Sequence, residues 1–594
     1  CTALHVATAT ASAAGATERP NILFILADDL GYGDVAVYPN PSKVRLATPS
    51  LDALAADGMM FTQAYAGYSV CAPSRRTLMT GYHTGHFPQA GTGPLLSNTS
   101  KTIAHVLQSA GYATMLIGKW GLDGNYQQPQ APAEGFPTLQ GFENFYGQSD
   151  QWQCHDYYPP FMFNGSVNIS VAQNRGASVA TCGEDFTNCV WSADLWTPAA
   201  VSWISDRCAE KVPWFLYLAY TSPHAGSVGN VGESDVPGPR LSKSQYAKET
   251  AWPLVERHFA NTVSLVDHAV GEVVDAVDAA GAKSDTVIFF SSDNGAHQEG
   301  GHQYQFFNSS GYLNGYKRSI HDGGHRAAFI VRWPGSVPPG SVSDHQLCFY
   351  DFFPTAAAIA GVEAEVPSTV DGHSFLPTLR GSAQAQPAFI YHEFSSCHDP
   401  SLQQYPNLST SFGQNIRMGN WSGVCVGSQK PCAGTDPQAE SRFFLYNMAA
   451  DEAQKVDVAA ANPHVVAEIL SIMHHEFNYS YDPATAHSVN PPSPWPLPGP
   501  HPAASPCAEG LTGRWFGSRN HTYSLTLSGN AVKLATTDGC CAWDTAEGTV
   551  DGNTIQVLAS NDKHTFSLHN VGHLSTDRCV VTWSERWAPW RKQE

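Results

Sequence analysis

The sequence predicts an α/β fold with a mostly parallel central sheet flanked by helices, followed by a small all-β domain. Between residue 20 and about residue 480, unbroken apolar runs alternate with stretches of helical periodicity. This alternation is typical of a parallel sheet that is buried between helices. After residue 506 the chain instead contains short segments of alternating polarity separated by Gly, Asn and Asp, which is typical of antiparallel strands joined by turns.

The strands and helices of the larger domain follow one another in a regular order. Four apolar runs predict buried strands: NILFILA (21–27), YATMLIG (112–118), WFLYLAY (214–220) and TVIFF (286–290). Three segments with helical spacing predict helices: LDALAADG (51–58), KTIAHVLQSAG (101–111) and VSLVDHAVGEVVDAVDAAG (263–281). We therefore expect one large α/β domain over residues 19–489, with a subdomain at its C-terminal end.

A domain boundary is expected at the proline-rich run 490–506, NPPSPWPLPGPHPAASP, which predicts a stiff extended linker. Beyond it, TYSLTLSG, NAVKLATT, NTIQVLAS and CVVTWSERW predict strands of a small antiparallel sandwich or barrel over residues 507–594. Cys507, Cys540, Cys541 and Cys579 can form two disulfides there, in a pairing that the sequence leaves open. Residues 1–18 are either the remnant of a signal peptide or a tail.

The composition of the chain restricts the cellular compartment in which we expect the protein and the partners that it can bind. The formal charge of −20 argues against nucleic acids and anionic membranes as partners, and no apolar run approaches the length of a membrane span. Fourteen cysteines and eight Asn-x-Ser/Thr sequons indicate the secretory route, so we expect a secreted glycoprotein, or one of another secretory compartment, with disulfide bonds. The sequons begin at Asn98, Asn164, Asn168, Asn308, Asn407, Asn420, Asn478 and Asn520.

Polar residues follow each of the four predicted strands. They are Asp28 and Asp29, Lys119, His224, and Asp293 with Asn294. Because ligands bind beyond the carboxyl ends of strands in open α/β sheets, we expect these side chains at one rim. Three carboxylates and an amide oxygen are hard ligands that suit Ca²⁺ or Mg²⁺, although each acidic pair taken alone also fits a turn or a helix cap.

The run Cys71-Ala72-Pro73-Ser74-Arg75-Arg76 predicts a helix that starts near Cys71. A helix N-terminus favours an anion, and Arg75 adds a fixed positive charge one turn later. A disulfide is the alternative fate of Cys71 in a secreted chain. Without Cys1, Cys71 and the four C-terminal cysteines, eight cysteines remain, an even number that is compatible with an unpaired Cys71.

The motifs occur together in one order along residues 19 to about 480. They are NILFILADDLGYGDV, CAPSRRTLMTG, LIGKWGL, TSPHAG, FFSSDNGAHQEGG, GYKRSIHDGGHR with a following VRWPG, and LYNMAADEAQKVDVA. In this order they resemble the formylglycine-dependent sulfatases of the arylsulfatase type, within the alkaline-phosphatase-like superfamily. The resemblance implies a sulfuric ester hydrolase that acts on aryl sulfates or sulfated carbohydrates, and a formylglycine-generating enzyme as its partner during maturation.

The resemblance also implies roles for single residues. Asp28, Asp29, Asp293 and Asn294 resemble the family's calcium ligands, and a formylglycine made from Cys71 completes that site. Arg75 resembles the residue that holds the formylglycine hydrate. Lys119, His224 and Lys317 resemble the sulfate-binding group, in which His224 or Lys317 protonates the leaving oxygen; Lys317 taken alone also fits an ordinary surface lysine.

One position departs from the family pattern. Many relatives have a histidine two residues after the lysine of GKW, where this chain has Gly121. That histidine is usually assigned to the breakdown of the covalent sulfate adduct. His155, in the segment CHDYYPP, is the first candidate to replace it and to contact substrate; His297 and His302 are the alternatives.

Two other functions fit parts of the sequence. A phosphatase or phosphodiesterase of the same fold commonly uses Ser or Thr and two zinc ions, whereas this chain has CAPSR and a carboxylate set for one metal. A catalytically lapsed extracellular binding glycoprotein would explain Gly121 and the extra β domain. Retention of Cys71, Arg75, both lysines and the four metal-ligand candidates argues against that second alternative.

Overall fold

The computed structural model describes residues 19–477, except 87–95, 98–99, 125–131, 229–234, 396–401, 403–407, 409, 429–430 and 432–440, together with strands between residues 512 and 584. The expected N-terminal segment 1–18, the proline-rich linker 490–506 and the four C-terminal cysteines lie outside the described residues. The chain forms two compact units, Cys1–Leu497 and Pro498–Glu594.

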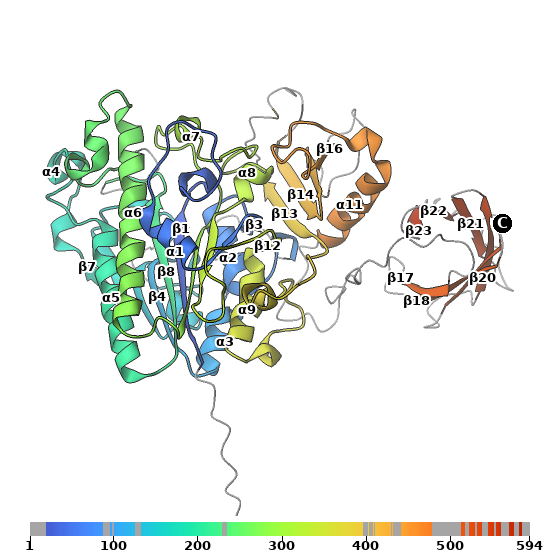
Figure 1. The fold of residues 1–594 in the computed structure, drawn as a ribbon, viewed down its shortest axis with the longest axis horizontal. Coiled ribbons are helices and arrows are strands. Elements are labelled where there is room, and N and C mark those ends of the chain that lie inside the picture. Colours follow the sequence, from blue (N-terminus) through green and yellow to red (C-terminus); the bar gives the residue numbers. More distant parts are fainter. Residues whose placement is uncertain are drawn as a thin grey trace, which may run out of the picture. The chain divides into compact units, whose positions relative to one another are not determined.

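A ten-stranded mixed sheet forms the centre of the first unit, in the order β11-β2-β10-β9-β1-β8-β4-β5-β6-β7 (Figure 1). Its five middle strands, β9 to β5 in that order, are parallel, and antiparallel strands flank them on both sides. This confirms the expected α/β class with a mostly parallel centre. The bounds are β1 Asn21–Asp28, β2 Met59–Phe61, β4 Ala113–Lys119, β5 Asn144–Gln148, β6 Phe161–Asn164, β7 Val167–Ser170, β8 Trp214–Pro223, β9 Thr286–Ser292, β10 Phe329–Arg332 and β11 Ser341–Ser343.

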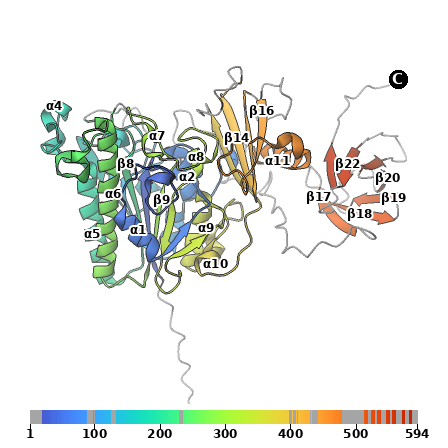
Figure 2. The ribbon, with the colours of Figure 1, turned by 45° about the horizontal axis from the view of Figure 1, so that its top comes forward.

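Helices cover both faces of this sheet (Figures 1 and 2). Helices α5 and α6 lie on one face, and α2, α3 and α9 lie on the other. The expected helices are α1, α3 and α6, and all are present. The bounds are α1 Pro49–Ala56, α2 Cys71–Thr80, α3 Ile103–Ser109, α4 Val179–Cys182, α5 Ser192–Glu210, α6 Leu254–Ala279, α7 Tyr304–Phe307, α8 Asp322–His325, α9 Phe352–Ile359 and α10 Leu376–Leu379.

Strand β1 shows why the predicted strands are unbroken apolar runs. Because side chains alternate along a strand, Ile25 packs in the core beneath α5 and α6, while Phe24 packs in the core on the opposite face. The Phe24 ring lies 4.7 Å from that of Phe352 in α9 and 5.9 Å from that of Phe289 in β9. A strand with helices on both faces has no exposed side to carry polar residues. Its polar residues therefore occur only where it ends.

The C-terminal part of the first unit is a four-stranded antiparallel sheet, β13-β14-β15-β16, that packs against helix α11. Ile416 and Leu445 of the sheet share a core with Ile469 and Met473 of α11. Two short strands, β3 and β12, form a separate parallel pair. The bounds are β3 Ala64–Tyr65, β12 Leu347–Cys348, β13 Ile390–Ser395, β14 Phe412–Met418, β15 Trp421–Gly427, β16 Ser441–Asn447 and α11 Pro463–Glu476.

The described residues of the second unit are all in β-strands, as expected. Each of its strands pairs in antiparallel fashion with the next strand along the chain, which makes a meander. The four segments predicted as strands correspond to β18, β19, β21 and β23. The bounds are β17 Thr512–Phe516, β18 Thr522–Ser528, β19 Ala531–Thr536, β20 Thr545–Asp551, β21 Thr554–Ala559, β22 Asn570–Leu574 and β23 Val581–Ser584.

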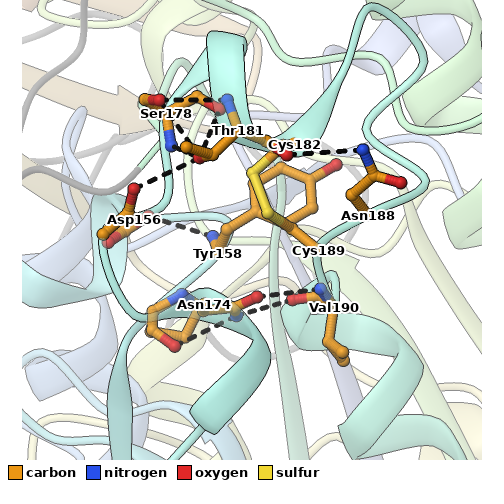
Figure 3. The surroundings of a disulfide bond; sticks show 11 residues. Asp156, Tyr158, Asn174, Ser178, Thr181, Cys182, Asn188, Cys189 and Val190 are labelled. Carbon is orange, nitrogen blue, oxygen red and sulfur yellow. Dashed lines mark hydrogen bonds between the residues drawn. A yellow bond between two sulfur atoms is a disulfide. The ribbon is translucent and has the colours of Figure 1, made fainter.

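A disulfide joins Cys182 and Cys189 in the segment between β7 and α5 (Figure 3). Asn174 reinforces this segment, because its side-chain amide donates to Val190 O and its carbonyl accepts from Val190 N, both at 2.8 Å. Cys71 is not in a disulfide, as expected, but neither are Cys154, Cys208 and Cys348. The eight cysteines other than Cys1, Cys71 and the four C-terminal ones are therefore not all joined in disulfides, although their number is even.

Three of the described sequons have exposed asparagines: Asn164, Asn168 and Asn420. Asn308 differs, because its side-chain amide donates to Gly311 O and to Asn40 Oδ1 inside the fold. Within the described residues, no helix is long and apolar enough to cross a membrane.

A buried cluster of charged groups joins the small sheet subdomain to the main domain. His86, six residues beyond α2, lies with Nδ1 2.8 Å from Asp371 Oδ1 and Nε2 3.4 Å from Oε2 of Glu476, the last residue of α11. His83 Nε2 lies 3.1 Å from the same Glu476 oxygen, while its Nδ1 accepts a hydrogen bond from Gly85 N. Burial lowers the pKa of His86, but the charges of Asp371 and Glu476 outweigh it, so the net shift is upward. His86 is therefore a charged bridge between two carboxylates.

The raised pKa of His86 makes this joint sensitive to pH. A histidine whose folded pKa is raised adds stability that is present below its unfolded pKa and is lost as the pH rises through the folded pKa. We expect His86→Asn to lower the melting temperature at about pH 6, and the difference from the wild type to shrink toward about pH 9. Thermal unfolding across this range measures it, with His464→Asn on the exposed face of α11 as the control. A difference that does not change with pH would contradict the charged bridge.

Candidate active site

Three carboxylates meet at the carboxyl ends of β1 and β9. Asp28 is the last residue of β1 and Asp29 follows it, while Asp293 and Asn294 follow β9, the parallel neighbour of β1. Asp29 N donates to Asp293 Oδ1 at 3.1 Å, and Asn294 Nδ2 donates to Asp29 Oδ1 at 2.6 Å. All four residues are fully buried. The structure thus brings the two predicted acidic pairs together.

Three cations from other elements surround these carboxylates. Arg75 of α2 donates to Asp293 Oδ2 through Nε at 2.9 Å, and its Nη2 lies 2.8 Å from the same oxygen in an ion pair. Lys119, the last residue of β4, has Nζ 2.6 Å from Asp28 Oδ2. Lys317 has Nζ 2.8 Å from Asp29 Oδ2. Each buried carboxylate therefore has a buried cationic partner, which is the usual condition for burying such charges.

The pKa values differ among the three carboxylates. Burial raises the pKa of Asp28 and of Asp29, but the neighbouring cations outweigh it; the pKa of Asp29 falls to about 2, and that of Asp28 also lies below its ordinary value. Burial and then the charges of Asp28 and Asp29 raise the pKa of Asp293 to about 7. The cations thus keep Asp28 and Asp29 ionised, whereas burial and the two neighbouring carboxylates favour a proton on Asp293.

The oxygen atoms of this cluster fit a hard divalent cation. Asp28 Oδ1 and Asn294 Oδ1 are buried and accept no hydrogen bond. One oxygen of each of Asp28, Asp29 and Asp293 lies within 4.8 Å of the others. Carboxylate and amide oxygens that lack other partners are the ligands that Ca²⁺ and Mg²⁺ prefer. A cation there would also relieve the repulsion that raises the pKa of Asp293.

Cys71 is the first residue of α2, so the predicted helix start is confirmed. Its side chain is buried, and its Sγ lies within 4.8 Å of ligand atoms of Asp28 and His224. Burial raises the pKa of the Cys71 thiol to about 11. The thiol is therefore neutral at ordinary pH, and an unmodified Cys71 is a weak nucleophile.

His224 and Lys317 form a contiguous pair beside the carboxylates. His224 follows β8, and its Nε2 lies 3.0 Å from Lys317 Nζ. Burial and the charge of Lys317 hold the pKa of His224 well below its usual range, so the ring is neutral. Lys317 Nζ also lies 2.7 Å from Glu299 Oε2. The sequence analysis did not single out Glu299, because an isolated acidic residue in a glycine-rich loop carries no spacing signal.

Among the three histidines considered as replacements at Gly121, His155 is the one that a single side chain connects to residue 71. Its ring stacks on His224 with centroids 4.4 Å apart, and Gln151 connects it to Cys71. His297 lies farther from His224, at 6.4 Å, and its Nε2 contacts Pro223 O. His302 pairs with Glu256 at 2.7 Å and stacks on Phe259, so it belongs to the core rather than to the site.

An exposed aromatic residue borders the site. The Trp152 ring meets the edge of His155 with centroids 5.7 Å apart, yet 49% of Trp152 is exposed. A large apolar side chain fixed beside a polar site is a common means of binding a ring. The indole therefore offers a flat surface next to His155.

Comparison with known proteins gives one consistent result. A sulfatase family model matches residues 20–362. The chain is 31% identical to N-acetylgalactosamine-6-sulfatase of Mus musculus over 405 residues, which cover 64% of this chain and 70% of that one. It is 28% identical to steryl-sulfatase of the same species over 448 residues, with 64% and 68% covered. The crystal structure of Ps i-CgsB is similar over 79% of this chain and 94% of that one, at 25% identity and a TM-score of 0.59.

The compensation of buried charge predicts the effect of removing Arg75. We expect Arg75→Met to lower the free energy of unfolding by about 3 to 5 kcal/mol, because Asp293 and Asp28 stay buried after losing a partner. Urea unfolding of the full chain measures this. Arg207→Met is the matched control, since Arg207 pairs with Glu210 on the exposed face of α5 and such pairs contribute about 0 to 1 kcal/mol. Equal losses in the two variants would contradict the account.

Proposed function

The chain belongs to the sulfatase family and is a sulfuric ester hydrolase; from this premise we propose that it cleaves sulfate esters of sugars or phenols with a formylglycine made from Cys71 and a bound calcium ion. One observation carries the proposal. Cys71, three buried cations and three carboxylates from separate elements meet at one end of the parallel strands. This is the place where an α/β sheet binds its ligand.

A formylglycine hydrate at residue 71 would supply an oxygen nucleophile with a second oxygen on the same carbon, and a bound calcium ion would lower the cost of the negative charge. Asp28, Asp29, Asp293 and Asn294 would hold the calcium with residue 71. The orphaned oxygens of Asp28 and Asn294 and the crowding at Asp293 support this assignment. The high pKa of the Cys71 thiol supports a modified residue as the nucleophile.

The cations of the site would bind the sulfate group. Arg75 lies one turn after residue 71 in α2 and would hold its oxygens. Lys119 contacts Asp28 and Lys317 contacts Asp29, so both ammonium groups lie at the carboxylate cluster. Charge-assisted hydrogen bonds from such groups stabilise the charge that develops on sulfuryl oxygens. A chain of formal charge −20 can therefore bind an anion at this one place.

The pair of Lys317 and His224 would supply the proton for the leaving oxygen. His224 is neutral and its Nε2 lies 3.0 Å from the lysine ammonium, so Lys317 carries the proton and His224 is its acceptor. Contacts of Lys317 with Asp29 and Glu299 fix the ammonium in place. The Lys317 ammonium can then donate a proton to an alcohol oxygen that leaves beside it.

The substrate is proposed to be a sulfate ester of a molecule that contains a ring. Relatives of the chain are named for N-acetylgalactosamine-6-sulfate and for steryl sulfate, which are ring compounds. The exposed Trp152 indole beside His155 supports a ring-binding subsite. We further propose a secreted glycoprotein that receives its formylglycine from a generating enzyme during maturation. The exposed sequons at Asn164, Asn168 and Asn420 and the Cys182–Cys189 disulfide support that route.

Conversion of residue 71 is the first test. In active protein we expect mass spectrometry to find an aldehyde in place of the thiol at residue 71. We expect turnover of an aryl sulfate or a hexosamine 6-sulfate to exceed that of the matched phosphate ester by about tenfold or more, a barrier difference of about 1.4 kcal/mol. Cys71→Ala should abolish turnover, whereas Cys208→Ala, at another unpaired cysteine, should retain it. Active protein with only unmodified or disulfide-bonded Cys71 would refute the proposal.

Calcium removal is the second test. We expect calcium at about 100 times its dissociation constant to raise the free energy of unfolding of chelator-treated protein by about 2.7 kcal/mol, because the ion binds the folded state. Asn294→Leu should reduce this gain, since it removes one proposed ligand oxygen. Asn144→Leu, at an exposed position of β5, is the matched control. An equal calcium effect in both variants would remove Asn294 from the site.

A further inference from the structure

Gln151 occupies the space above Gly121. Gly121 lies two residues after the end of β4 and has a φ of 76°, a conformation that favours glycine. A Cβ built at this position would lie 2.4 Å from Gln151 Oε1, so the end of the Gln151 side chain would have to move to make room for it. The side chain of Gln151 therefore fills the place into which a side chain at residue 121 would project.

Gln151 also connects residue 71 to His155. Its Nε2 donates to Cys71 Sγ at 3.3 Å and lies 3.3 Å from His155 Nε2. When residue 71 is a formylglycine, the position of Sγ stands for an oxygen on the same carbon. A carboxamide can donate and accept at once, so it can bridge these two groups in either orientation of its amide.

The backbone around Gln151 is fixed on both sides. Asp150 Oδ1 accepts hydrogen bonds from the N–H groups of Trp152 and Gln153, both at 3.0 Å. Gly121 N donates to Ser149 O at 3.0 Å, which ties this loop to the segment after β4. Gln151 is thus held beside Gly121 by the local structure rather than by a chance rotamer.

Hydrogen bonds and ring packing also fix the position of His155. Its N–H donates to Trp152 O at 3.1 Å, and its carbonyl accepts from Ser227 N at 3.0 Å. Its ring packs between the rings of Trp152 and His224. Gln151 therefore connects the Sγ position of residue 71 to the imidazole of His155, whose own position is fixed by these contacts.

We propose that Gln151 is a positioning residue of this active site. It takes the place of the side chain that residue 121 lacks, and it holds residue 71 and His155 at a fixed position relative to each other. The proposal rests on the function proposed above. Gln151 orients the oxygen of residue 71, and it does not itself transfer a proton, because a carboxamide is neither an acid nor a base at ordinary pH. Its contribution therefore falls on the turnover of bound substrate and not on the binding of substrate.

The variant Gln151→Ala tests this contribution. We expect kcat to fall by about tenfold or more while KM changes little, which is the pattern for an interaction that acts after binding. We also expect the fraction of enzyme with sulfate covalently attached to residue 71 during turnover to rise, as measured by intact-protein mass. Gln108→Ala, on the exposed face of α3, is the matched control. Unchanged kcat, or a change confined to KM, would overturn the proposal.

A pair of variants at residue 121 tests the packing claim without relying on activity. Gly121→His alone should lower the melting temperature, because its side chain collides with Gln151 and its φ is unfavourable. Gly121→His combined with Gln151→Ala should recover part of this loss and raise kcat above that of Gln151→Ala. Equal melting temperatures for Gly121→His and the double variant would overturn the claim that Gln151 fills this space.

The two proposals fail in different ways. If wild-type protein contains no aldehyde at residue 71 and turns over no sulfate ester, the proposed function fails. If the wild type is converted and active and Gln151→Ala equals it in kcat, only the role of Gln151 fails. Gln151→Asn separates this role from misfolding: it keeps the amide but is one methylene too short, so we expect a wild-type melting temperature with reduced kcat.

Discussion

The buried carboxylates at the ends of β1 and β9 are the constraint on which this molecule depends. Asp28, Asp29 and Asp293 lie side by side without solvent, an arrangement that is costly unless cations compensate it. The compensating groups come from three other elements, so the helix, the strand end and the loop that carry them must all dock correctly. The site and the fold therefore stabilise each other. A sheet without these helices could not hold the carboxylates, and a site without the carboxylates would leave the cations unpaired.

Parallel strand topology makes this arrangement possible. Neighbours in the order β9-β1-β8-β4 all run in the same direction, so their carboxyl ends lie at one edge. Each strand is apolar along its length because helices cover both faces, and each delivers its polar residues only where it ends. The N-terminus of α2 lies at the same edge and adds the helix dipole to the positive charges there.

The sequence predicted most of this because its signals were local. The strands, the start of α2 at Cys71 and the residues after each strand were visible as runs and motifs, and the structure brings those residues together. Contacts made by single residues far apart in the chain were not visible. Glu299 reaches Lys317, and His86 reaches Glu476 across 390 residues, without any spacing that a sequence pattern could reveal. Cysteine parity was compatible with an unpaired Cys71, which the structure confirms, but it could not show that Cys154 and Cys348 are also unpaired and buried.

The relation between Gly121 and Gln151 shows where sequence reasoning can be extended. Strands β4 and β5 are parallel neighbours in which Lys119 pairs with Gln148. Residue 121 lies two positions beyond the first strand's end and residue 151 lies three positions beyond the second, so the two segments leave the sheet side by side. A side chain missing from one segment can be supplied by the other with little change in the position of its functional atoms. When a functional residue is missing from the motif after one strand, its replacement is therefore best sought in the segment that follows the neighbouring strand. The register of the two paired strands identifies the position to inspect, more than distance along the chain does.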